Sequence, residues 1–597
     1  MSDLVKNNIF LVPLLYIIRL IVISLILFNF NKSFAEQSLI DAEPFEIWGQ
    51  STSQSIPQLE NSNLEAESIE DDLSVSDPSS LEGVIKSDFS YSIDDTIGLY
   101  DKSNGGFSPD IWKFSNYKDI NYLINELPLV TINDEILRLK LIALLTVATP
   151  PIDSDQSNEN FLNLKLRHLK SIGDYESIFS ISEFIDDSNW DQNLVDNIIS
   201  FHLLKANYKN ICNKNIFNKV SRENISLKIR AFCNAMSNNL PAIDLIISLI
   251  IEEETYDDEL VYILNSYLNE TEININKIKH MDLFKLNLIN NKNIDFSEII
   301  NENSEIELQL FYVLAKTKSN IKKISLTENL LSRGIINSVI LADVYEKYMT
   351  ENEIEIDIDL NSLSLGVEKR ALLYNQIRKT SNQDELISLA SIYVQNMGNV
   401  NLLNNSANLI YDKIKVISPK QEHRKHAPAV CLLLLLNNDF DQCRNWLSNL
   451  DFVSEAEEIK TKIRLYLSLS NNITDFNQND IDYLLSSDDE LSEKQKNILV
   501  KYSELKYQED LIDYWKSENE FNQIQTILPN IKLVEYLKSI PLKNKGEIIL
   551  LISLIHGNQP SNSLDQYSLF LIMESLNKLD PIYLDNFVFE YLVNNPV

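Results

Sequence analysis

Scarcity of glycine is the feature that most constrains the fold of this 597-residue chain. It has 11 glycines, and five of them precede residue 107. No glycine lies between Gly173 and Gly334, and Pro241 is the one proline between Pro151 and Pro419. Sheet-rich and nucleotide-binding folds need glycine in tight turns and wherever backbone approaches a phosphate, whereas helices joined by short polar turns do not. The sequence therefore predicts an all-α fold.

Apolar residues with helical spacing follow acidic residues that are typical of helix starts. After Asp257, apolar residues recur at i, i+3, i+4, i+7 and i+8 from Leu260. Asn133-Asp134-Glu135 begins a similar stretch, which Pro150-Pro151 ends. Ser108, followed by Pro109 and Asp110, predicts a further helix start, with Trp112 facing the first hairpin. The all-apolar stretch Cys431–Leu436 predicts a helix that is covered on both sides.

A turn signature recurs between the helical stretches: Gly or Asn, a polar residue, an apolar residue, and a second apolar residue three positions later. In the first position we expect the left-handed conformation that ends one helix, and in the second a cap for the next. The signature resembles the turn of tetratricopeptide-like helix pairs, but its spacing is irregular. The sequence thus predicts an irregular α-solenoid of antiparallel helix hairpins. The signature begins at Gly173, Asn238, Gly398, Asn438 and Asn519.

Three regions are expected along the chain. Residues 1–35 have the features of a signal peptide, because an apolar stretch after Arg19 leads to a small-residue cleavage pattern at Ala35. The alternative is an uncleaved anchor spanning Ile9–Phe30, although Arg19 would then lie within the bilayer. Residues 36–97 carry 15 acids against one base and predict a disordered acidic linker, and residues 98–597 form the helical body. Export to the periplasm is expected in either case, with inner-membrane anchorage if the segment is not cleaved.

The four cysteines form two pairs that are close in the sequence, as expected for an oxidising compartment. A turn at residues 437–439 separates Cys431 from Cys443, and an antiparallel hairpin there would bring them within disulfide range. The sequence predicts a Cys431–Cys443 disulfide first and a Cys212–Cys233 disulfide second. The alternative is four buried free thiols.

The chain carries 52 basic against 87 acidic residues, a net charge of −35. A field of that sign repels phosphate backbones and anionic lipid, so nucleic acid is not expected as a partner.

No motif predicts a catalytic, cofactor or metal site. His423 and His426 are three residues apart beside two cations, which departs from the metalloprotease pattern. The stretch from Asp357 to Glu368 partly matches a calcium loop but lacks its glycine, and residues 353–360 alternate as in an extended connector. In lytic transglycosylases a catalytic Glu-Ser pair is followed by glycine-rich motifs. Here Glu574-Ser575 is not followed by such a motif. We therefore expect no catalytic residues, no metal ligands and no cofactor.

Residues 98–112, 123–128 and 137–145 resemble the start of a family of uncharacterised exported helical proteins of alphaproteobacteria, over about residues 95–180. The resemblance implies an exported, helical protein and no specific activity.

A non-catalytic periplasmic scaffold or adaptor that binds another envelope protein is the function expected from these features. Two alternatives remain: an envelope hydrolase acting on peptidoglycan, with a site assembled from dispersed acids, and a membrane-anchored tether with the acidic linker as its spacer.

Overall fold

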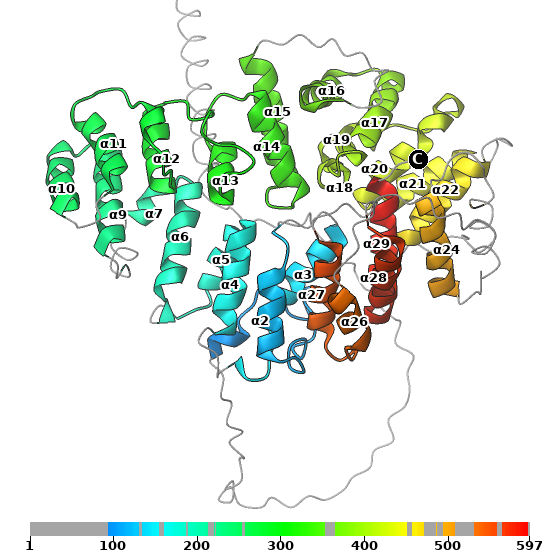
Figure 1. Ribbon diagram of the computed structural model, residues 1–597. Coiled ribbons are helices and arrows are strands. Elements are labelled where there is room, and N and C mark those ends of the chain that lie inside the picture. Colours follow the sequence, from blue (N-terminus) through cyan, green and yellow to red (C-terminus); the bar gives the residue numbers. More distant parts are fainter. Residues whose placement is uncertain are drawn as a thin grey trace, which may run out of the picture. The chain divides into compact units, whose positions relative to one another are not determined.

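The computed structural model describes most of the body of the chain (Figure 1). The predicted signal peptide and nearly all of the predicted acidic linker lie outside the described residues. All described residues belong to one compact unit within Gln58–Val597. The described ranges are 93–129, 134–154, 160–186, 189–212, 220, 223–252, 257–352, 365–450, 457–470, 485, 493–507, 531–557 and 564–594.

Every regular element in these ranges is a helix, which confirms the all-α prediction. Isolated bridges pair Tyr100 with Thr146 and Asn116 with Ile152. Within the described ranges, no helix has the length and apolarity needed to cross a bilayer. The helices are η1 (Ile93–Thr96), α2 (Tyr117–Glu126), α3 (Asp134–Leu145), α4 (Phe161–Ile172), α5 (Tyr175–Ser182), α6 (Gln192–Leu204), α7 (Tyr208–Ile211), α9 (Glu223–Met236), α10 (Leu240–Glu252), α11 (Asp258–Leu268), η4 (Ile275–Lys277), α12 (Leu283–Asn291), α13 (Ile306–Leu314), α14 (Ile321–Ser332), α15 (Ser338–Glu351), α16 (Val367–Lys379), α17 (Gln383–Gly398), α18 (Leu403–Ser406), α19 (Asn408–Ile414), η5 (Gln421–His426), α20 (Ala427–Leu436), α21 (Phe440–Leu450), α22 (Glu457–Leu469), α24 (Glu493–Tyr507), α26 (Ile531–Ser539), α27 (Lys545–His556), α28 (Gln566–Leu579) and α29 (Pro581–Asn594).

Most of the expected helix starts are confirmed. The Asp257 side chain accepts a hydrogen bond from the amide of Leu260 at 3.0 Å, and the apolar stripe that follows is buried apart from half-buried Leu268. Helix α3 begins at Asp134 as predicted, and α20 is buried between α17, α21 and α22.

The helix start predicted at Ser108 is wrong, because residues 108–114 form successive turns and α2 begins only at Tyr117. Asn116 is the N-cap and accepts from the Lys118 amide at 2.9 Å. The physical reason is Trp112, which is fully buried and donates from Nε1 to the carbonyl oxygen of Ala143 at 3.2 Å. Tertiary packing of this indole overrides the local helix signal.

The recurrent turn signature adopts its expected conformation at three sites. Gly173, Asn238 and Asn438 have φ values of 86°, 57° and 58°, and Asp174 caps α5 by accepting from the Ser177 amide at 3.0 Å. At the third site the prediction is wrong, because Gly398 is the last residue of α17 and Asn401 takes the left-handed conformation instead. The fifth site, at Asn519, lies outside the described residues. The later apolar position is fully buried at all four described sites, namely Ile178, Ile243, Leu403 and Cys443.

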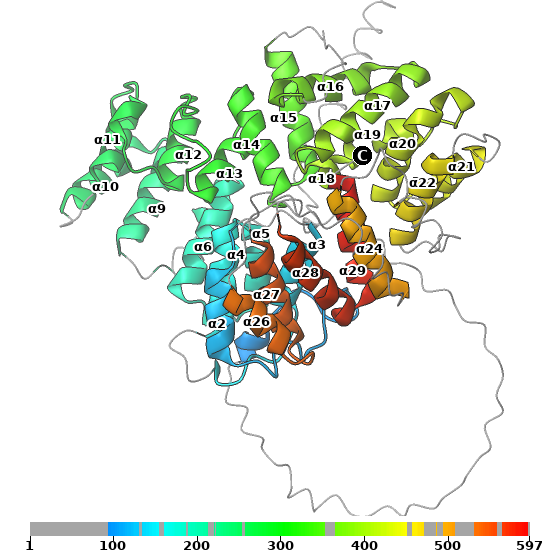
Figure 2. The ribbon, with the colours of Figure 1, turned by 45° about the vertical axis from the view of Figure 1, so that its right-hand side comes forward.

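Most helices pack against helices close to them in the sequence, but the last ones pack against the first. Helix α27 contacts α2 and α3, and α29 contacts α3 and α18. Figures 1 and 2 both show α27 beside α2 and α3. At this junction the backbone of Gly546 lies against the ring of Trp112, and the Gly546 amide donates to the carbonyl oxygen of Ile111 at 3.3 Å. Helices more than 400 residues apart in the sequence therefore share one core.

Candidate functional sites

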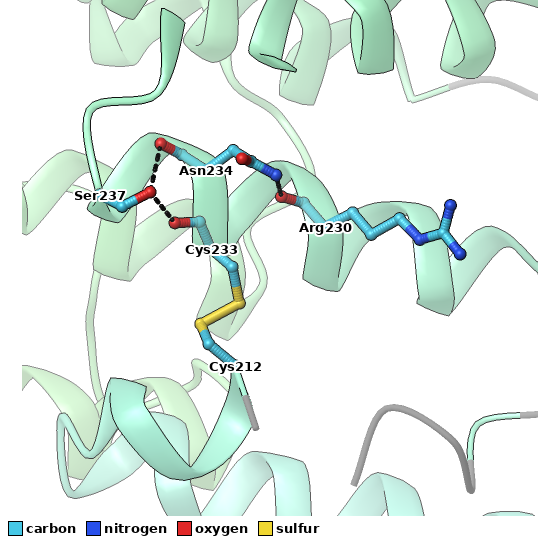
Figure 3. The surroundings of a disulfide bond; sticks show 5 residues. All are labelled: Cys212, Arg230, Cys233, Asn234 and Ser237. Atoms are coloured by element: carbon cyan, nitrogen blue, oxygen red, sulfur yellow. Dashed lines mark hydrogen bonds between the residues drawn. A yellow bond between two sulfur atoms is a disulfide. The ribbon is translucent and has the colours of Figure 1, made fainter. Parts of the chain in front are cut away.

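The Cys212–Cys233 disulfide is formed, as predicted (Figure 3). Its Cα atoms are 5.7 Å apart, and it joins the residue that follows α7 to the last turn of α9. Figure 3 shows the hydroxyl of Ser237 donating to the carbonyl oxygens of Cys233 and Asn234, at 2.9 and 3.2 Å. Cys212 is exposed and Cys233 half-buried, so a reductant in solution can reach the bridge.

The predicted Cys431–Cys443 disulfide is not formed, and both residues are buried free thiols. The hairpin of α20 and α21 does bring them close, as expected. The Cys431 Sγ, however, points to the main-chain carbonyl oxygen of Cys443 at 3.8 Å. A disulfide needs the two Cβ–Sγ bonds to face each other, which sequence spacing alone does not determine. Burial, and then the neighbouring Cys443 side chain, raises the pKa of the Cys431 thiol.

Asp384, Glu422 and His423 form a cluster whose carboxylate oxygens and ring nitrogens lie within 4.8 Å of one another. His423 Nε2 is 2.9 Å from Asp384 Oδ1, on the first turn of α17. The imidazole is buried and stacks on Trp446 of α21, with ring centroids 6.4 Å apart. The cluster thus joins η5 to α17 and α21.

Lys420 supplies positive charge to this cluster. Its Nζ lies 3.1 Å from Asp384 Oδ1 and 3.7 Å from Glu422 Oε1. The hydrogen bonds from His423 and then Lys420 lower the pKa of Asp384. A divalent ion would have to displace this ammonium and would find three protein ligands, fewer than a structural zinc site has. The geometry therefore fits an ion-pair network between helices better than a metal centre.

A second charged cluster lies where the last helix, α29, meets the start of α3. Both carboxylate oxygens of Glu590, on α29, accept from main-chain amides at the start of α3: Oε1 from Asp134 at 2.7 Å and Oε2 from Glu135 at 2.9 Å. Arg138 forms a two-pronged pair with Glu135, at 2.9 and 2.7 Å. Asn404, on α18, donates to Asp134 Oδ2 at 3.0 Å. Three segments that are distant in the sequence therefore meet at one helix start.

The acids of this cluster have raised pKa values. Burial is the main cause for Glu590, followed by the charge of Asp134. Burial likewise raises the pKa of Asp134 to about 6. Carboxyl pairs with raised pKa values are common in acid–base catalysis. Here, however, both oxygens of Glu590 already bind the free amides and positive dipole end of α3, and the side chain is buried. We interpret the cluster as a structural contact between α29 and α3.

The other residues weighed in the sequence have structural surroundings. Ser575 donates to the carbonyl oxygen of Leu571 at 2.8 Å, and Glu574 pairs with Lys501 at 2.7 Å. Glu368, the last position of the partial calcium loop, accepts from the Tyr348 hydroxyl at 2.7 Å. The rest of that loop and the extended connector lie outside the described residues, except for 365–367. Three further histidines are buried and one is exposed, namely His168, His202, His556 and His280.

Sequence reasoning missed both charged clusters. Asp134 and Glu135 were recognisable as a helix start, but nothing near them in the sequence indicates that Glu590 provides the cap. His423 was considered with its neighbours, whereas its partner Asp384 is 39 residues earlier. In a chain with 87 acids, no single carboxylate is distinctive before the helices are placed.

Comparison of the chain with protein-family models, curated proteins and solved structures finds no match. Its function must therefore be inferred from its own residues.

Proposed function

We propose that this protein is a non-catalytic helical-repeat scaffold that binds another protein of the cell envelope. The neighbour-to-neighbour packing of helix pairs from α4 to α22 supports an irregular solenoid, an architecture that offers long surfaces to protein partners. The export features of residues 1–35 support the compartment, and the Cys212–Cys233 bridge agrees with it.

The outer face of α10 is the observation on which the proposal depends. This helix packs on α9 and α11 through four buried isoleucines. On its opposite side, Leu245 and Leu249 are 62% and 38% exposed. These two residues are one helical turn apart and so lie on the same face, whereas Ile251, which is 50% exposed, lies on a different face at the end of the helix. Large exposed apolar side chains that lie together on one face are typical of an interaction surface.

The charges around Leu245 and Leu249 indicate the chemistry of the partner. Asp244 and Glu252 are exposed on the same helix, and α10 contains no basic residue. An amphipathic protein segment with apolar residues bordered by lysine or arginine would match both features. We therefore propose that α10 binds such a segment of an envelope protein.

Affinity capture from detergent-solubilised envelopes, using the full-length protein, tests this function. We expect a stoichiometric partner that the wild-type protein retains and the L245S/L249S/I251S variant loses. The matched control is I321S/V339S/V416S, which replaces three exposed apolar residues in other parts of the body and should retain the partner. A photo-crosslinker at position 245 should then join the protein to a basic amphipathic segment. Equal capture by both variants, or crosslinking to an acidic segment, would contradict the proposal.

The hydrolase alternative predicts turnover of peptidoglycan by the purified protein, and the tether predicts that the mature chain stays in the membrane fraction. Both assays belong beside the capture experiment.

A further inference from the structure

The segment from the start of α26 to the first residues of α27 is basic, although the chain as a whole is strongly acidic. Residues 531–546 contain four lysines and one acidic residue, Glu535, whereas the whole chain has a net charge of −35. Lys538 and Lys543 are exposed on the end of α26 and in the loop that follows it. The turns before α2 lie against this loop, because Asn544 Nδ2 donates to the carbonyl oxygen of Phe114 at 3.2 Å. These turns add Lys113, whose Nζ lies 3.4 Å from Asp110.

Large apolar side chains project between these lysines. Phe114 is 41% exposed and lies close to two ammonium groups, with Lys543 Nζ 5.1 Å and Lys113 Nζ 5.8 Å from its ring centroid. Tyr567 is 52% exposed beneath Lys538, whose Nζ lies 4.7 Å from that ring. Leu542 is 53% exposed in the loop. We call Lys113, Phe114, Lys538, Leu542, Lys543 and Tyr567 the lysine–aromatic patch; Figure 2 shows α26, α27 and α2 close together.

We propose that the lysine–aromatic patch docks this protein on an anionic membrane surface. Lysine ammoniums near such a surface attract acidic headgroups, and aromatic and leucine side chains insert at the boundary with the acyl chains. The patch contains all three residue types.

Two observations favour lipid over an acidic peptide as the partner. Residues 107–118 and 531–546 contain no arginine, the side chain that binds carboxylates through two parallel hydrogen bonds. Leu542 and Lys543 are exposed in a loop between two helices, where side chains project outwards to enter a surface. Lysines that act as point charges beside projecting apolar groups suit a lipid surface.

The net negative charge of the chain does not oppose this docking. At physiological ionic strength, exposed charges more than about 8 Å apart are largely screened, so the patch acts through its own lysines. The acidic remainder is repelled from the same headgroups. The protein would therefore bind in one orientation, with the α26–α27 loop towards the lipid.

Hydrogen exchange of the full-length protein, measured on vesicles, tests the proposal at the patch itself. A local measurement is needed because the apolar residues 9–30 would bind any bilayer, so total binding to vesicles would not report on the patch. We expect exchange in residues 110–115 and 538–546 to slow at least tenfold on phosphatidylcholine vesicles containing about a third phosphatidylglycerol. Pure phosphatidylcholine should leave it unchanged, and high ionic strength should reverse the protection.

Two triple variants complete the experiment. K113Q/K538Q/K543Q should lose the protection, whereas K279Q/K316Q/K318Q, which neutralises three exposed lysines elsewhere, should keep it. Thermal unfolding of both variants checks that they fold. Protection on neutral vesicles, or protection that survives in K113Q/K538Q/K543Q, overturns the proposal. Protection by polyglutamate but not by anionic vesicles would identify an acidic polypeptide as the partner instead. Capture through α10 is measured separately, so either proposal can fail alone.

Discussion

Gly546 is placed where a larger residue would collide with the core. A Cβ atom built on it would lie 2.4 Å from the ring of Trp112, which is fully buried. We expect Gly546→Ala to lower the free energy of unfolding by about 1–2 kcal/mol, because overpacking costs more than the better helix propensity of alanine returns. Urea unfolding measures this difference.

Gly366→Ala is the matched control for this substitution. A Cβ there meets nothing within 4 Å, and we expect a cost below about 1 kcal/mol, because Gly366 is the N-cap of α16 and alanine caps a helix less well than glycine. Equal effects of the two substitutions would show that Trp112 does not fill the space beside Gly546.

Asp134 should make stability fall as pH rises. Its pKa is about 6 in the folded protein against 3.8 as the ordinary value, so the folded state binds more protons between these limits. The contribution of this group to the free energy of unfolding is therefore lost as pH rises from about 4 to about 6. Asp134→Asn cannot titrate and keeps an acceptor for Asn404. As pH rises from about 4 to about 6, we expect the free energy of unfolding of the variant to increase by on the order of 1 kcal/mol relative to that of wild type.

Asp258→Asn controls for the position, because Asp258 is an exposed acid in the first turn of α11. Urea unfolding at both pH values should give the same pH dependence for this variant and wild type. An Asp134→Asn variant with unchanged pH dependence would refute the burial of that charge.

The cysteines provide a third test at this scale. In denaturant without reductant, we expect alkylation of Cys431 and Cys443 only, and of all four cysteines after reduction. The C212S/C233S variant should lose about 2–4 kcal/mol of stability, because the bridge closes a loop between residues 21 apart. A Cys431–Cys443 peptide in a non-reduced digest would contradict the structure.

At the scale of helices, a buried ion pair joins α14, α15 and α16. Arg370 Nε donates to Glu328 Oε1 at 3.0 Å, and the Tyr345 hydroxyl donates to the same oxygen at 2.6 Å. Arg370→Met would leave the Glu328 carboxylate buried without its cation, and we expect a loss of about 3–5 kcal/mol. Chemical denaturation measures it.

The exposed pair Arg378–Glu346 offers the control, since the same substitution at Arg378 removes a guanidinium that is 45% exposed. We expect Arg378→Met to cost less than about 1 kcal/mol. Similar losses in the two variants would mean that burial does not determine the strength of these pairs.

Helix starts and turns show how far local sequence predicts this fold. The predictions of a helix start at Asp257 and a turn at Gly173-Asp174 are confirmed, because these caps are made within a few residues along the chain. The helix start predicted at Ser108 is wrong because distant contacts decide the outcome there: Trp112 is held by α3 and α27. The turn predicted at Gly398 is wrong because α17 continues to that residue and the left-handed conformation falls on Asn401. Local signals predicted the elements well where no distant side chain competes.

At the scale of the whole molecule, the packing of α29 on α3 could not be predicted from the sequence. Both helices carry ordinary apolar faces, and nothing in their residues specifies a partner more than 400 positions away. The same limit applies to the Asp134–Glu590 and Asp384–His423 contacts. An irregular repeat gives the order of neighbours along the chain but not a contact between its first and last helices.

This packing predicts that the stability of the two distant segments is coupled. Phe587, on α29, is fully buried, and Phe587→Ala should cost about 3–5 kcal/mol. Hydrogen exchange should become faster in both α29 and α3, with little change in α9–α11. Phe232→Ala, which empties a core position on α9, should instead accelerate α9 and α12. Faster exchange confined to α29 would show that the two segments are independent.

The contact between α29 and α3 also sets an order of events during synthesis. Helix α3 ends at Leu145 and α29 begins at Pro581, and a ribosome needs tens of seconds to make the residues between them. Throughout that interval the amides at the start of α3 lack the Glu590 carboxylate, and Trp112 lacks the α27 backbone that covers it. Nascent chains thus carry an α3 whose first amides are uncapped and a Trp112 whose ring is only partly covered. The part of the body that is synthesised first can therefore complete its packing only when the last helices have been made.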